Sequence, residues 1–240
     1  MGERATAAKE AVGDRATASR EAAADAIAAV KPRLRGVSHE WAFFVSLFLG
    51  AGLIVAAKTP RATLAVAIYA VSLSALFGTS ALYHRVNWRR PGARRWMRRL
   101  DHSMIFVFIA ASFTPVALLA LEGTLASVIL TVVWGRAAAG VILKLVWISA
   151  PKWLSAGLYV ALGWVAVVAS PALWNKLGWL SVLAFGVGGL LYTAGAVIYA
   201  CERPNPWPRT FGYHEIFHTL VVAAAATHYA VIAFAVLPQA

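Results

Sequence analysis

The chain has 240 residues, of which 60% are hydrophobic and only 13% are charged, and its formal net charge is +12 at pH 7. Soluble domains carry about 25% charged residues, so this composition excludes an ordinary soluble globule and favours an all-α, polytopic membrane protein. The single cysteine, Cys201, excludes an intrachain disulfide and any cysteine-based zinc cluster.

The first residues differ in composition from the rest. Residues 1–32 are rich in alanine, interleave acids with bases, and include five of the ten acidic residues of the chain. This composition favours a helix but offers little apolar area to bury. The acids also stand where a secretory signal would be basic or apolar, so we expect no such signal. We predict a cytoplasmic tail at 1–32, disordered or marginally helical, and a transmembrane domain at 33–240.

Seven apolar segments follow the tail, and each is long enough to cross a bilayer as a helix. Together they predict a seven-transmembrane helix bundle. In chain order, the predicted spans are Trp41–Ala57, Ala62–Tyr83, Ser103–Leu121, Leu125–Trp147, Leu154–Trp174, Leu177–Ala200 and Glu215–Leu237.

Basic residues between the spans predict the orientation. Residues 1–35 hold seven lysines and arginines, and the connection at 85–99 holds seven arginines. Connections rich in basic residues stay in the cytoplasm, and two spans separate these two. We therefore expect a multi-pass cell-membrane protein whose N-terminus is cytoplasmic and whose C-terminus is outside. We expect the 85–99 connection to bind anionic lipid headgroups rather than nucleic acid.

Ionisable residues in membrane spans are costly and often functional. The second span ends in "GTSALYHR", where Ser80 and His84 share a helix face, and Asp101 lies at the start of the third span. The seventh begins with His214 and His218, which also share a face. Because successive spans run in opposite directions, all five residues fall in one layer at the cytoplasmic edge.

These residue types are typical of a catalytic zinc site, in which three histidines leave the fourth position open. Nitrogen ligands argue against calcium and magnesium. We predict Zn²⁺ ligands at His84, His214 and His218, and zinc would lower the pKa of its bound water toward about 7. Asp101 would orient or deprotonate that water, and Ser80 would support it or the substrate oxyanion. The alternative is that each residue is interfacial, satisfied by headgroups or backbone.

The stretch "HEIFH", residues 214–218, also matches the HExxH signature of soluble zinc proteases. His228 lies about 15 Å further along the same helix, so it cannot supply the third ligand, and His84 is the better candidate. We expect His228 and His102 to be packed or hydrogen-bonded. His39 lies near the same layer as a candidate supporting or gating residue. Arg136, in the fourth span, either lines a polar cavity or bonds to neighbouring carbonyls.

The segments "RLRGVSHEWAF", "SALYHR", "RRLDHSMIFVFIAASFTPVALL" and "FGYHEIFHTLVV" resemble the hemolysin III family. That family falls within the progestin and adipoQ receptor (PAQR) group, in the superfamily that includes alkaline ceramidases. The resemblance covers about residues 33–237. It implies a seven-helix bundle and a cytoplasmic-side zinc held by His84, His214 and His218, with Asp101 reaching the metal through water and Ser80 as the motif serine.

The resemblance implies two functions. The first is zinc-dependent hydrolysis of a lipid amide or ester, with membrane lipids as partners and a ceramide-like or fatty-acyl substrate. The second is a non-enzymatic receptor, membrane-homeostasis factor or channel/cytolysin-like protein in which zinc is structural. Retention of zinc with loss of hydrolysis on changing Asp101 would favour the first.

Overall fold

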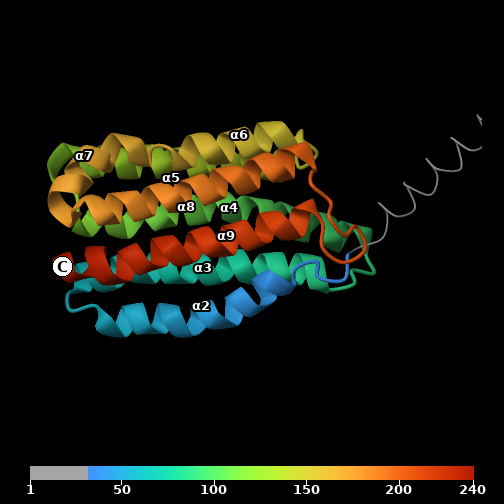
Figure 1. The fold of residues 1–240 in the computed structure, drawn as a ribbon, viewed down its shortest axis with the longest axis horizontal. Coiled ribbons are helices and arrows are strands. Elements are labelled where there is room, and N and C mark those ends of the chain that lie inside the picture. Colours follow the sequence, from blue (N-terminus) through green and yellow to red (C-terminus); the bar gives the residue numbers. More distant parts are fainter. Residues whose placement is uncertain (1–31) are drawn as a thin grey trace, which may run out of the picture.

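The structure, a computed structural model, describes residues 32–240. The predictions made for the tail, apart from Pro32, lie outside these residues. Seven helical segments in the described part are long and apolar enough to cross a membrane. They run side by side along the long axis of the molecule (Figure 1). The predicted all-α seven-helix membrane bundle is therefore confirmed.

The helices begin and end at residues whose local chemistry explains the boundary. Pro60 and Pro91 stand in the first turns of their helices, where the missing N–H costs nothing. The Thr59 side chain accepts a hydrogen bond from the backbone N–H of Ala62. The helices are α2 (Val37–Ala56), α3 (Pro60–Arg85), α4 (Pro91–Leu119), α5 (Gly123–Val146), α6 (Lys152–Gly163), α7 (Ala166–Leu177), α8 (Trp179–Cys201) and α9 (Tyr213–Val231).

The arginine-rich connection is shorter than the sequence predicted. Helix α4 begins at Pro91, whereas the predicted span began at Ser103, so most of the 85–99 stretch is helical. Arginine, alanine and methionine all have high helix propensity, and a proline in the first turn favours helix initiation. The predicted span marks the residues that can enter a bilayer, and the helix extends beyond it toward the arginines.

The fifth and seventh spans are less regular than predicted. The fifth is divided into α6 and α7 at Trp164 and Val165, and the backbone N–H groups of Val165, Val167 and Val168 bond three residues back instead of four. Gly163, just before the division, has low helix propensity. After Val231 the seventh continues as a π-helical turn at Ile232–Val236 and a short 3₁₀ turn at Leu237–Gln239.

Helix α4 lies at the centre of the bundle. Of the residues in its most apolar stretch, 61% are buried, compared with 17% for the corresponding stretch of α8. Its side chains contribute to both apolar clusters of the core, Phe106 to the cluster with α5, α6 and α7 and Phe108 to the cluster with α3 and α9. Residues at the beginning of α4 are therefore held at a defined place between the surrounding helices.

A close approach between α4 and α5 gives a test of this packing. A Cβ added at Gly140 would lie 2.4 Å from the buried ring of Phe106. Overpacking a core costs about 1–3 kcal/mol, so we expect Gly140→Ala to lower the thermal unfolding midpoint of the detergent-solubilised protein. Gly135→Ala is the matched control, because nothing lies within 4 Å of its added Cβ. Equal midpoints for the two variants would contradict this packing.

Candidate metal centre

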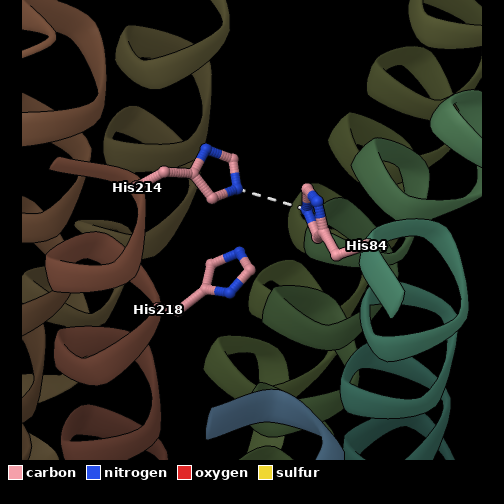
Figure 2. A group of neighbouring side chains, drawn as sticks. All are labelled: His84, His214 and His218. Atoms are coloured by element: carbon pink, nitrogen blue, oxygen red, sulfur yellow. Dashed lines mark hydrogen bonds between the residues drawn. The ribbon is translucent and has the colours of Figure 1, made fainter. Parts of the chain in front are cut away.

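The end of α3 and the beginning of α9 bring three histidines together. His84 is the penultimate residue of α3, and His214 and His218 occupy the first two turns of α9 on one face. Figure 2 shows the two α9 rings one above the other, turned toward His84. One ring nitrogen from each histidine lies within 4.8 Å of the other two. The histidine ligands predicted from two distant segments are thus neighbours.

The spacing of the ring nitrogens fits a shared metal ion. Nε2 of His84 lies 3.2 Å from Nε2 of His214. Two histidine ligands of a tetrahedral metal, each 2.0–2.1 Å from the ion, would be about 3.3 Å apart. His84 and His218 are buried, and His214 is half-buried. The three donors therefore have the identity and spacing needed to hold a transition-metal ion.

A carboxylate lies beside the three histidines. Asp101 is buried in α4, and its Oδ2 atom is 3.7 Å from Nε2 of His84 and 3.6 Å from Nδ1 of His102. The buried side chain of Ser80 lies beside Asp101, and both residues line the same cavity. All five residues singled out from the sequence thus occupy one site, and the roles assigned to them stay predictions.

Glu215, the glutamate of the HExxH match, has a structural role. It is buried, its carboxylate pairs with Arg35, and it accepts a hydrogen bond from the backbone N–H of Gly212 at 2.8 Å. The second contact caps the first turn of α9. Both contacts hold the carboxylate at the beginning of the helix, which argues against the protease interpretation of "HEIFH".

Two other histidines lie outside the group and have backbone partners. Nδ1 of His102 lies 2.8 Å from the carbonyl of Arg98, and Nε2 of His228 lies 3.1 Å from the carbonyl of Phe185. Arg136 is exposed on α5 and does not line the cavity described below. The two alternatives considered for Arg136 both stay predictions.

A long apolar cavity of about 340 Å³ adjoins the site. Asp101 and His218 lie at one end of its wall, and Val116 and Leu173 lie near the other. Asp101 and Val116 are both in α4, about 22 Å apart along the helix axis. This volume falls within the range of small-molecule sites, about 300–1,000 Å³. The site therefore faces a space that suits an extended apolar molecule.

Sequence reasoning missed the cavity and the contribution of Arg35. Gly186 and Gly189 of α8 line the cavity and leave room in its wall, but glycines in a membrane helix equally indicate close helix packing. Arg35 lies 180 residues from Glu215 in the chain. No local signal connects the two, because only the folded bundle brings them together.

Comparisons with known proteins identify the family to which the chain is similar. Residues 27–229 match the family described as Haemolysin-III related. Hemolysin-3 of Bacillus cereus is 30% identical over 182 residues, covering 76% of this chain and 80% of that protein. A hemolysin-3 homolog of Bacillus subtilis (strain 168) is 29% identical over 167 residues, covering 70% and 75%. The human monocyte to macrophage differentiation factor is 32% identical over 165 residues, covering 68% and 66%.

The histidine cluster predicts metal binding that depends on each member. We expect His84→Ala, His214→Ala and His218→Ala each to weaken binding by more than the roughly 10- to 100-fold that loss of an outer hydrogen-bond partner costs. Elemental analysis of purified protein and competition with a chelator would measure this. His228→Ala is the matched control and should retain the metal. Full retention in all three cluster variants would contradict the site.

Proposed function

The chain belongs to the haemolysin-III-related family of membrane proteins, and on that premise we propose that it is a zinc-dependent hydrolase of a lipid amide or ester. One observation carries the proposal: three histidines and a buried carboxylate meet at the end of a long apolar cavity. Metal ligands alone would suit a structural site. A reactive carboxylate and a space for substrate beside them favour catalysis.

The donor set supports zinc as the metal. Imidazole nitrogens suit zinc, copper, iron and nickel, whereas calcium and magnesium prefer oxygen. Three histidine ligands, with a fourth position left to a small molecule, are typical of catalytic zinc. The cluster contributes no thiolate, and the only cysteine, Cys201, is an exposed residue at the end of α8. A zinc ion held there supplies Lewis acidity that activates water for attack on a carbonyl carbon at neutral pH.

Asp101 would accept a proton from the attacking water, and Ser80 would orient Asp101. Oδ2 of Asp101 faces His84 at 3.7 Å and is placed to accept that proton. Ser80 lies beside the same carboxylate and would fix its orientation. Asp101 would then pass the proton to the leaving amine or alcohol. Burial of both side chains excludes bulk water from this step.

The cavity supports a lipid as the substrate. Its wall runs about 22 Å from Asp101 to Val116 and is largely apolar, with Phe113 and Leu173 toward the far end. A fatty-acyl or ceramide-like chain would bury apolar surface there, at roughly 25 cal/mol for each Å² removed from water. An acyl carbonyl at the near end would lie beside the histidines. Lipid amides and esters combine these two parts.

We further propose that the metal centre faces the cytoplasm. The arginines of the 85–99 stretch lie at the same end of the bundle as His84, and basic residues are retained on the cytoplasmic side. Arg94, Arg95 and Trp96 are exposed at the beginning of α4. Anionic headgroups of the inner leaflet would bind there.

Asp101→Asn tests the hydrolytic role, because the amide keeps the size and polarity of the side chain but cannot accept the proton. General acid–base catalysis contributes about 10²- to 10⁴-fold, so we expect turnover to fall by that factor while the metal content is unchanged. Zinc-loaded protein in lipid nanodiscs would be assayed with a ceramide-like amide and a phospholipid ester.

The wild-type protein decides between the two functions considered. If it binds zinc but hydrolyses neither substrate, the proposed hydrolase fails, and the metal has a structural role in a receptor or membrane-homeostasis protein. If the Asp101→Asn variant turns over as fast as the wild type, Asp101 is not the proton acceptor.

The single cysteine tests the orientation. Cys201 is exposed and ends α8, at the histidine end of the bundle. A membrane-impermeant maleimide should therefore not label Cys201 in intact cells and should label it after permeabilisation. Cys201→Ala controls for labelling of other groups. Equal labelling before and after permeabilisation would place the metal centre outside.

A further inference from the structure

The segment at residues 33–39 passes between the two helix ends that carry the histidines. Its backbone is attached to the loop before α9, since the N–H of Arg33 donates to the carbonyl of Arg209 at 3.0 Å and that of Leu34 to Thr210 at 3.2 Å. The segment then enters α2 at Val37. It therefore touches the α3 end and the α9 beginning at once.

Gly36 brings the segment against His84. It adopts a φ of 81°, in the left-handed region that favours glycine. A Cβ added at this position would lie 2.6 Å from Cβ of His84. The backbone of the segment thus packs directly on the root of one histidine side chain, at a distance that only glycine permits.

The ring of His39 packs against the ring of His218. The two rings are stacked, with centroids 3.8 Å apart and planes inclined by 7°. Phe77 packs edge-on against the other side of His39, at 5.1 Å. His39 is buried, and within the described residues neither of its ring nitrogens has a hydrogen-bond partner of normal distance and angle. The contact that His39 offers to the site is therefore the flat face of its ring.

Arg35 fixes the first turn of α9, which carries His214. Its guanidinium pairs with Glu215, whose side chain is only 2% exposed. Glu215 also accepts the backbone N–H of Gly212, so one carboxylate joins the segment to the beginning of the helix. His214 lies between Gly212 and Glu215 in the chain and directly precedes Glu215. Each of the three histidines is thus adjacent to a different contact of the 33–39 segment.

We propose that the 33–39 segment is a positioning element for the metal centre. Gly36 limits the position of the His84 side chain, Arg35 fixes the helix turn that carries His214, and His39 holds the ring of His218 in place by stacking. These are positioning residues, since they act through the histidines. The inference rests on the metal site of the proposed function and adds that the ligands take their geometry from a segment that supplies no ligand. Outer contacts of this kind commonly alter metal affinity by about 10- to 100-fold.

The test uses the full chain in nanodiscs, loaded with Co²⁺ as a visible probe and with Zn²⁺ for affinity. We expect His39→Ala to weaken Zn²⁺ binding by about 10-fold or more and to alter the Co²⁺ absorption bands, which report ligand geometry. His39→Phe keeps a flat ring without nitrogens and should restore both. Arg35→Met should weaken binding similarly through the first turn of α9.

Glu40→Gln is the matched control. It removes the exposed 2.8 Å ion pair between Glu40 and Arg85, one residue from His39, and leaves Arg35, Gly36 and His39 unchanged. Its affinity and spectrum should equal those of the wild type. Thermal unfolding separates loss of metal from loss of fold, and Arg35→Met tests the same inference should His39→Ala not be recovered folded.

The outcomes are distinguishable. Normal binding by the wild type, with unchanged affinity and spectrum in both His39→Ala and Arg35→Met, would overturn this inference and leave the metal site standing. A defect in His39→Phe as large as in His39→Ala would also overturn it, because the nitrogens and not the ring face would then matter. Absence of metal from the wild type would overturn the proposed function and this inference together.

Discussion

Three imidazole rings held within 4.8 Å of one another, in a protein built to cross a membrane, are the constraint on which the rest of this structure depends. Polar groups away from water need partners. Two Nε2 atoms at 3.2 Å cannot satisfy each other without a proton or a cation between them. The histidines therefore need a shared proton or cation. The position of the site, the contacts around it and the proposed chemistry all follow from that need.

The bundle meets this constraint by concentrating polar contacts at one end. Asp101 and Ser80 enter from α4 and α3, and the Arg35–Glu215 pair holds the beginning of α9. The remainder of the cavity wall is largely apolar. The proposed chemistry and the proposed substrate binding are thus divided along the axis of α4, whose first part carries Asp101 and whose later part lines the cavity.

Sequence and structure agree wherever one residue property decides the outcome. The number of spans follows from apolar length, and the pairs Ser80–His84 and His214–His218 share faces because four residues make about one helical turn. They differ where neighbouring properties compete. The helix that starts at Pro91 was missed because arginines are poor membrane residues but good helix formers. The division of the fifth span reflects the low helix propensity of Gly163, which apolar length does not measure.

By itself, the sequence determined the seven-helix class, the common layer of His84, Asp101, His214 and His218, and the resemblance to a family. Hydropathy, helix periodicity and alternating span direction are enough for these. Only the tertiary structure decided the 3.2 Å approach of His84 and His214, the cavity, and the contacts of Arg35 and His39. Such features depend on side chains that are distant in the chain, and on how tightly helices pack, which no local pattern records.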